Sequence, residues 1–404
     1  MSIADNLDFL RHLPKPSALQ DALSTGWGLR MPGGGSPLAE TPVFGSNPGN
    51  LTMLSYVPDG LTGPYPLVVV LHGCSQTAAG YDIGTGWSTL ADRYGFALLM
   101  PEQKRGNNPN TCFNWFDAGD IVRDGGEAAS IRQMIAQMAA DHGIDSARVC
   151  ITGLSAGGAM ASVMLATYPE VFAAGAIIAG LPYGVATTMR DALSAMRQPT
   201  PLAAPSLGEL VRDASPHRGH WPRISVWHGT ADRIVHPGNA NEIVKQWLDV
   251  HGLPTAPMAQ TLIDGYPRQV WWDADGKTIV ESFTITDMAH GTPLGFGAGE
   301  ERYGVQGPYL IEAGISSSFY IAQFFGLTER VHHPRVAIDK AGKIDKIETP
   351  KTTQVALNRA KDDADSRTFT ARPVDQAHPL QRRSRTVDIN AVITRALTAA
   401  GLMK

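Results

Sequence analysis

Short apolar runs alternate along this chain with longer segments in which apolar residues recur at helical spacing. The runs are rich in β-branched residues and are closed by glycine or proline, as is typical of strands buried on both faces of a sheet. PLVVVLHG at 66–73 shows this pattern most clearly, whereas LTMLSYVP at 51–58 indicates an edge strand. Further buried strands are predicted at FALLMPE (96–102), RVCITG (148–153), AAGAIIAG (173–180) and RISVWHG (223–229).

Helical segments separate these strands. DGGEAASIRQMIAQMAADHG at 124–143 has a strong helical period, opens at the capping residue Asp124 and closes at Gly143. Strands that alternate with helices indicate an α/β fold, in which a mainly parallel central sheet carries helices on both faces. Further helices are predicted at WSTLADRYG (87–95), SAGGAMASVMLATYP (155–169) and NANEIVKQWLDVHG (239–252).

Two segments depart from this alternation. Residues 181–222 combine an Ala/Met-rich stretch with proline-rich loops, which predicts an insertion on the rim of the sheet and a candidate lid. Residues 270–285, VWWDADGKTIVESFTI, alternate around a D-A-D-G turn and predict a hairpin. The last helix of the main body is expected at about 309–325.

The pattern divides the chain into an arm and linker at 1–50, a main domain at 51–326 and an appended tail at 327–404. Ile3, Leu7 and Leu10 share one helical face, so the arm is expected to dock on the body or on a hydrophobic partner surface. In the charged and proline-dotted tail, only residues 387–402 have a helical pattern.

Composition narrows the class of protein. The chain has 404 residues, 43% hydrophobic content and a formal net charge of −4, with a pI of about 6.3. No basic field favours nucleic acid, and no apolar run approaches the roughly 20 residues that a membrane helix needs. The first residues lack the basic and apolar regions of a secretion signal, which predicts a cytoplasmic protein, although a mature secreted chain would have the same pattern.

The stretch G-L-S-A-G at 153–157 lies between a predicted strand and a predicted helix. In that context the pattern G-x-S-x-G indicates a nucleophile elbow, in which glycines permit a sharp turn and the serine projects above the sheet. Ser155 would also lie at a helix N-terminus, where developing negative charge is stabilised. We therefore expect Ser155 to be a catalytic nucleophile, against the alternative of an ordinary tight turn.

A serine nucleophile needs a base and an acid that orients the base, and in this class they follow in the order Ser, Asp or Glu, His. Asp232 follows a predicted buried strand, and His290 lies in a loop before the final helix, so they are predicted as the acid and the base. The alternatives are His228, His236 and Asp287. His228 precedes the acid, and Asp287 is so close to His290 that it is expected to shape the loop.

The oxyanion of such a reaction needs two N–H donors. One is expected from Ala156, the residue after the nucleophile, and the other from Cys74, in the loop that follows PLVVVLHG. His72, in the same loop, is expected to be a hydrogen-bonded structural histidine. No CxxC motif or Cys/His cluster indicates a metal site.

Five motifs carry a family resemblance. LHGCSQTAAGYDIGTGWSTLADRYGFALLMPEQ, NPNTCFNWF, GLSAGGAMA, HGTADRIV and MAHGTP together resemble the poly(3-hydroxybutyrate) depolymerase-type esterases, a family that borders feruloyl and acetyl-xylan esterases. The resemblance covers about residues 50–325. It implies an α/β-hydrolase fold, carboxylic ester hydrolysis and no cofactor, and it maps the triad onto Ser155, Asp232 and His290.

The resemblance also places two cysteines in active-site loops. Cys74 lies in HGCSQ and Cys112 in NTCFNWF; if these loops touch, a disulfide would brace them, and the alternative is two free thiols. Trp115 and Phe116 are candidates for an aromatic wall that binds substrate, against ordinary packing. Gln76 is a weaker candidate, both for shaping the same loop and for contact with substrate.

The expected function is hydrolysis of short hydroxyacyl esters or oligomers. A feruloyl or acetyl-xylan type esterase is the alternative with the same triad, because the motifs do not define the substrate. A peptidase, an acyltransferase and a non-enzymatic protein that binds polymer granules through the arm are the other classes considered.

Overall fold

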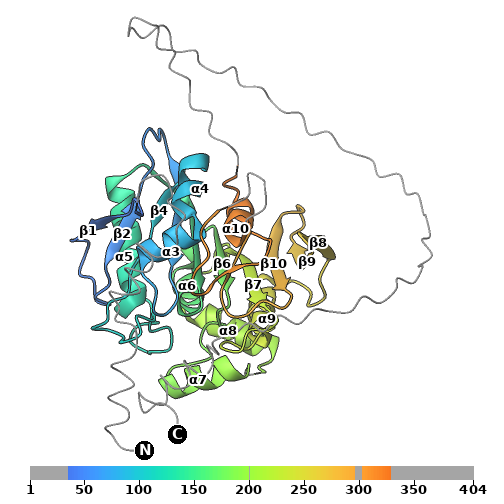
Figure 1. Ribbon diagram of the computed structural model, residues 1–404. Helices are drawn as coiled ribbons and strands as arrows, with labels where there is room; N and C mark the ends of the chain where they lie inside the picture. Colours follow the sequence, from blue (N-terminus) through green and yellow to red (C-terminus); the bar gives the residue numbers. More distant parts are fainter. Residues whose placement is uncertain (1–34, 200, 296–302, 329–404) are drawn as a thin grey trace, which may run out of the picture. The chain divides into compact units, whose positions relative to one another are not determined.

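A ten-stranded sheet is the central element of the computed structural model, which describes residues 35–199, 201–295 and 303–328 (Figure 1). All of these residues belong to one compact unit that spans residues 12–331. The strands are β1 (Ala39–Thr41), β2 (Met53–Tyr56), β3 (Tyr65–Leu71), β4 (Ala97–Leu99), β5 (Ile144–Leu154), β6 (Ala174–Ile178), β7 (Arg223–Gly229), β8 (Ala259–Ile263), β9 (Tyr266–Trp272) and β10 (Thr278–Ile285).

The strand order is β1-β2-β4-β3-β5-β6-β7-β10-β9-β8. The pairs from β4 to β10 are parallel, whereas β1, β2, β9 and β8 pair antiparallel at the two edges. The side chains of β3 divide between two cores, because successive residues of a strand face opposite sides. Val69 packs in one core and Val70 in the other, and both are fully buried.

Helices cover both faces of the sheet, as the alternation of strands and helices predicted. Residues of α5, α6 and α9 pack in the core on the Val69 face, and residues of α3, α4 and α10 pack in the core on the Val70 face. The helices are α3 (Ala78–Thr85), α4 (Trp87–Tyr94), α5 (Gly126–Asp141), α6 (Ala156–Thr167), α7 (Met189–Arg197), α8 (Ala204–Asp213), α9 (Gly238–His251) and α10 (Ser317–Phe325).

The insertion at 181–222 contains α7 and α8. Helix α8 packs on α9, where Arg212 forms a 2.7 Å ion pair with Asp249. Helix α7 lies farther from the sheet than α8 (Figure 1). Its C-terminal end contacts the segment that precedes α9, because the amide of His236 donates to Met196 O at 2.7 Å. The insertion is therefore attached to the loop between β7 and α9, and its role as a lid or substrate-binding cap stays a prediction.

The edge of the sheet corrects the sequence analysis. We expected residues 51–58 to form the edge strand, but β1 pairs outside β2 and occupies that position. Strand β1 and the buried Phe44 lie within residues 1–50, which the sequence pattern assigned to an arm and linker. The segment from residue 35 onward therefore belongs to the body, since a three-residue strand is too short to show a period.

Two helix boundaries also differ from expectation. Gly125, not Asp124, is the N-cap of α5; Asp124 has a positive φ of 64°, and its amide donates to the Tyr168 hydroxyl. The expected helix at 309–325 begins only at Ser317, because Leu310–Glu312 forms β12, which pairs with β11 (Thr292–Leu294). Ser316 caps the shorter helix by accepting from the amide of Phe319.

The hairpin predicted at 270–285 is confirmed, because β9 and β10 pair antiparallel. None of the helices in the described ranges has the length and hydropathy that would let it span a membrane. The expected helices at 3–10 and 387–402 lie outside the described residues.

Candidate active site

Ser155 occupies the turn between β5 and α6. Its backbone has φ 57° and ψ −117°, a conformation that side-chain-bearing residues rarely adopt. The turn is tight because a Cβ atom on Gly153 would clash with the carbonyl of Gly157, and one on Gly157 would clash with that of Leu71. Only glycine fits at these two positions, so the G-x-S-x-G pattern is required by the close approach of three backbone segments.

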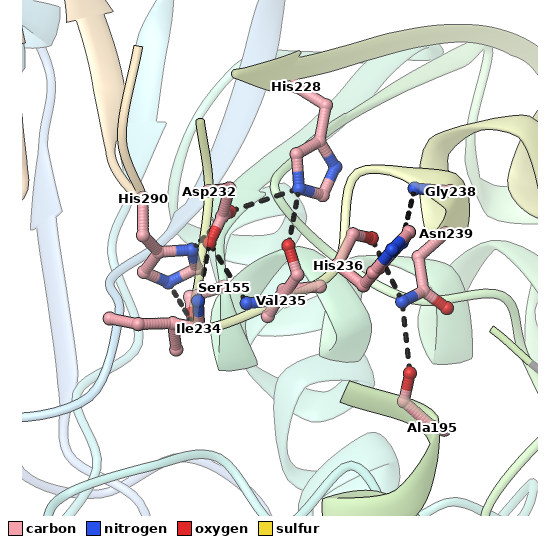
Figure 2. Close-up of polar contacts among 10 residues, drawn as sticks. All are labelled: Ser155, Ala195, His228, Asp232, Ile234, Val235, His236, Gly238, Asn239 and His290. Carbon is pink, nitrogen blue, oxygen red and sulfur yellow. Dashed lines mark hydrogen bonds and ion pairs between the residues drawn. The ribbon is translucent and has the colours of Figure 1, made fainter. Parts of the chain in front are cut away.

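His290 meets Ser155 from the loop between β10 and β11. Its Nε2 lies 2.9 Å from Ser155 Oγ, and its Nδ1 lies 2.7 Å from Asp232 Oδ2 (Figure 2). The carboxylate of Asp232 accepts a hydrogen bond from Nδ1, so Nδ1 carries the hydrogen. Nε2 is then free to accept the proton of the serine hydroxyl. The structure thus brings together the three residues that the sequence analysis selected.

Asp232 lies in the loop that follows β7. Its Oδ1 accepts from the amides of Ile234 and Val235 at 2.8 and 2.9 Å. Burial by itself raises the pKa of Asp232, but hydrogen bonds from His228 and His290 outweigh burial and hold the pKa well below its usual range. The carboxylate is therefore charged across the neutral pH range and stabilises a positive charge on His290.

The loops that carry Asp232 and His290 are joined through their backbones. The amide of Ala231 donates to Met288 O at 3.0 Å, and the amide of Thr230 donates to Ile285 O at 3.0 Å. A Cβ atom on Gly229 would clash with Met288 O, so glycine permits this approach. These contacts fix the distance between acid and base.

Two amides are the candidates expected to receive a developing oxyanion. Ala156 is the first residue of α6, where an N–H group has no partner within the helix. The chain that leads into the Cys74 loop lies directly against the elbow, because a Cβ atom on Gly157 would clash with the carbonyl oxygens of Leu71 and His72. This placement fits the expected pair of donors from Ala156 and Cys74.

Covalent and polar contacts hold the Cys74 loop. A disulfide joins Cys74 to Cys112, and the Ser75 amide donates to Asn110 O at 2.7 Å. Gln76 accepts from the Gly73 amide at 2.8 Å and donates to Pro308 O at 3.2 Å. The polar atoms of Gln76 therefore shape the loop, a role that competes with its predicted contact to substrate.

His72 is buried beneath the same loop. Its Nε2 accepts from the Gln103 amide at 3.1 Å, and its Nδ1 donates to Gly73 O at 2.8 Å. Burial lowers the pKa of His72 to about 4, so the ring is neutral at pH 7. These contacts match the structural role expected for this residue.

The two aromatic candidates have different environments. Trp115 belongs to the core on the Val69 face, whereas Phe116 is half-buried and meets Trp115 edge to face at 5.5 Å. Core packing therefore explains the position of Trp115, and Phe116 stays the better candidate for contact with substrate.

The alternative residues take other positions. His236 is exposed, and its Nδ1 accepts from the Gly238 amide at 3.0 Å. The Asp287 amide donates to Thr230 Oγ1 at 2.9 Å, as expected for a residue that shapes the loop. His228 contacts Asp232, which the sequence analysis missed because chain order says nothing about a second donor to the acid. Tyr309, whose ring meets the His290 ring edge-on at 5.9 Å, was also missed.

No group of three or more His, Cys, Asp or Glu side chains in the described part of the chain is arranged to hold a metal ion. The loops are held instead by hydrogen bonds, backbone contacts and one disulfide.

Comparisons with known proteins identify the relatives of this chain. Residues 51–264 match the family model described as esterase PHB depolymerase. A poly(3-hydroxyalkanoate) depolymerase C from Paucimonas lemoignei is 47% identical over 72% of this chain and 70% of its own length. A feruloyl esterase B from Talaromyces stipitatus is 32% identical over 67% of this chain and 76% of its own length.

Among solved structures, an acetyl xylan esterase from Aspergillus awamori aligns with a TM-score of 0.58 and 28% identity, over 63% of this chain and 93% of that one. The matched relatives are ester hydrolases, and the central sheet with its helices is the α/β-hydrolase fold. This chain belongs to the PHB depolymerase esterase family.

Proposed function

We propose that this protein hydrolyses short hydroxyacyl esters and oligomers through an acyl-enzyme on Ser155. Its carboxylic ester hydrolase activity follows from the family. The observation that supports the proposed machinery is the unbroken series of hydrogen bonds from Ser155 Oγ through His290 to Asp232.

Acylation begins at the serine hydroxyl. His290 Nε2 takes the hydroxyl proton while Ser155 Oγ attacks the ester carbonyl, and Asp232 stabilises the imidazolium that forms. The negative charge on the former carbonyl oxygen is received by the amides of Cys74 and Ala156. The tetrahedral intermediate collapses when His290 returns the proton to the departing alcohol, which leaves the acyl group on Ser155.

Deacylation repeats these steps with water. His290 takes a proton from water, the hydroxide attacks the acyl carbonyl, and the same two amides receive the charge. The proton then passes to Ser155 Oγ as the carboxylic acid leaves. No further group is needed to balance the reaction.

The higher identity to the poly(3-hydroxyalkanoate) depolymerase favours aliphatic hydroxyacyl esters as substrates. The feruloyl and acetylxylan esterases among the relatives support the second candidate, an esterase for plant-wall esters. Helix α7 and Phe116 are the features we expect to discriminate between them. Helix α7 contacts the loop that follows Asp232, and Phe116 follows directly on the buried Trp115.

The test compares wild type with Ser155→Ala on p-nitrophenyl butyrate, 3-hydroxybutyrate oligomers and methyl ferulate. We expect wild type to prefer the oligomers and the variant to lose at least about a thousandfold in kcat. A preference for methyl ferulate selects the second candidate. Equal rates for the two proteins contradict the role of Ser155.

The apolar arm with Ile3, Leu7 and Leu10, which lies outside the described residues, is proposed as the segment that contacts a hydrophobic polymer surface. Deleting residues 1–13 should then reduce adsorption to polymer granules and leave hydrolysis of p-nitrophenyl butyrate unchanged.

The disulfide between Cys74 and Cys112 supports an oxidising compartment, against the cytoplasmic location that the sequence pattern predicted. Cell fractionation tests this choice.

A further inference from the structure

A second histidine contacts the candidate catalytic acid. His228 lies near the end of β7, and its imidazole is 3% exposed. Its Nε2 is 3.0 Å from Asp232 Oδ2 and 3.0 Å from Val235 O. Figure 2 shows Asp232 between the rings of His228 and His290, so both histidines contact the same carboxylate.

The contacts of His228 define its tautomer. Both neighbours of Nε2 are acceptors, so Nε2 carries the hydrogen and shares it between the carboxylate and the carbonyl. Nδ1 is buried and has no hydrogen-bond partner in the described part of the chain. Within the described residues the ring therefore acts through Nε2, whose N–H group is directed at Asp232.

We propose that His228 is a positioning residue for the triad. It orients Asp232, and by its own hydrogen bond it takes up part of the negative charge of Asp232 that would otherwise act on His290. The inference rests on the proposed function of Ser155, Asp232 and His290. Asp232 Oδ2 receives one hydrogen bond from each histidine, and Oδ1 receives two from backbone amides. The donors from His228, Ile234 and Val235 therefore fix the orientation of the carboxylate that His290 Nδ1 contacts.

Loss of His228 has two consequences for the base. Asp232 loses one of its four donors and the Val235 carbonyl loses its donor, so the carboxylate is less firmly oriented and its hydrogen bond to His290 becomes less well directed. In addition, the negative charge of Asp232 is then stabilised by one hydrogen bond fewer, so it favours the imidazolium form of His290 more strongly before substrate binds. A larger fraction of the enzyme then lacks its free base at mildly acidic pH.

The titratable groups that act on Asp232 are the two histidines, which reach it from β7 and from the loop before β11. Arg233, His236 and Asp287 lie in the same two loops and are exposed. Their influence on the buried carboxylate is screened by solvent. The pH dependence of catalysis therefore reports on the pair of histidines.

The experiment compares wild type with H228L and H228Q, because the glutamine amide nitrogen can occupy the place of Nε2 and leucine cannot donate. We expect H228L to lose about 10-fold to 100-fold in kcat, with KM changed less than about threefold. The acid limb of its kcat/KM profile should move to higher pH, and H228Q should recover most of both effects.

A matched control separates catalysis from packing. His251 is a half-buried histidine of α9, and its Nε2 lies 3.0 Å from a backbone acceptor, Pro222 O. H251L should lower the unfolding midpoint without moving the pH profile. If H228L does not fold, the pair H228Q and H228N serves, since the shorter asparagine cannot reach Asp232.

The outcomes distinguish the two proposals. A wild-type pH profile and kcat in H228L, or identical profiles for H228Q and H228N, overturns the role of His228 and leaves the triad intact. Activity that persists in Ser155→Ala overturns the proposed function itself. Both proposals are supported if Ser155→Ala is inactive, if the pH profile of H228L is shifted, and if H228Q recovers the wild-type profile.

Discussion

At the scale of the residue, Ser155 combines a strained backbone with the side chain that is proposed as the nucleophile. A φ of 57° with ψ −117° costs about 1–3 kcal/mol for a residue with a Cβ atom. The surroundings impose the conformation, because the Ser155 amide donates to Ile178 O at 2.9 Å and its carbonyl accepts from Ala159 at 2.8 Å. The strain therefore persists in the folded protein and directs Oγ toward His290.

Substituting glycine for Ser155 should relieve this strain and abolish hydrolysis. We expect Ser155→Gly to raise the free energy of unfolding by roughly 1 kcal/mol relative to Ser155→Ala, because both lack the hydroxyl and only alanine keeps the strained Cβ. Urea denaturation of the two variants measures the difference. A less stable glycine variant would show that the backbone at Ser155 is relaxed.

Glu127 is a second residue whose environment has a measurable consequence. It is 1% exposed, and it accepts from the Gln103 side chain at 2.5 Å and the Asn114 amide at 2.9 Å. Burial, and then the charge of Asp120, raise its pKa to about 8 from an ordinary value of 4.5. The folded protein therefore holds a proton that the unfolded chain has released between these two values.

That difference makes stability fall as pH rises. Between about pH 4.5 and 8 the native state binds one more proton than the unfolded state, so the contribution of Glu127 declines by up to about 1.4 kcal/mol per pH unit. Glu127→Gln removes this dependence. Denaturant unfolding at pH 5, 6.5 and 8 should show a steeper decline for wild type than for the variant, and parallel curves would contradict the raised pKa.

At the scale of the element, loops between strands and helices determine the geometry of the site. The loops after β7 and β10 approach so closely at Gly229 and Met288 that no side chain fits between them. The Cys74 loop is held against the elbow through Gly157 and is tied to residue 112 by the disulfide. Rigid loops of this kind keep the reacting groups in place before substrate binds.

Gly229→Ala tests the first of these contacts. The added methyl must displace the carbonyl of Met288 and with it the loop that carries His290, so kcat should fall about 100-fold and stability by a few kcal/mol. Gly106→Ala is the matched control, because nothing lies within 4 Å of its Cβ position. Full activity in the Gly229 variant would mean that this approach does not set the distance between Asp232 and His290.

Replacing Cys74 and Cys112 together by serine tests the second contact. The disulfide spans 38 residues, and loop-closure entropy predicts that its loss lowers the unfolding free energy by about 3–4 kcal/mol. The Cys74 amide should also be less well placed, which lowers kcat more than it raises KM. Steady-state kinetics and denaturation measure both effects. As a control, a reductant should lower the unfolding free energy and kcat of wild type and leave those of the double variant unchanged.

At the scale of the whole molecule, the parallel strands bring together residues that are far apart in sequence. The carboxyl ends of β3, β5, β7 and β10 lie along one edge of the sheet, and the loops that follow them carry Cys74, Ser155, Asp232 and His290. Open α/β sheets place their sites at this edge. Predicting parallel strands from apolar runs was therefore enough to place the loops after β3, β5 and β7 at this edge. The parallel pairing of β10 with β7, which brings His290 to the same edge, was not predicted, because residues 270–285 were expected only as a hairpin.

The sequence predicted the buried strands and the triad because each has a strong local signal. β3 is a continuous apolar run, and Ser155 lies in a turn that only small residues permit. β1 was missed because three residues, two of them exposed and one half-buried, are too few to show a period, and β12 because it is equally short. His228 was missed for another reason. The motif HGTADRIV contains both His228 and Asp232, but chain order does not show that their side chains meet.

Covalent labelling tests the central claim most directly. Wild type treated with a fluorophosphonate should gain one adduct by intact mass, and peptide analysis should place it on Ser155. His290→Ala should label far more slowly, because the serine lacks its base. An enzyme that hydrolyses esters yet carries the label on another residue, or none at all, would contradict the account of this site.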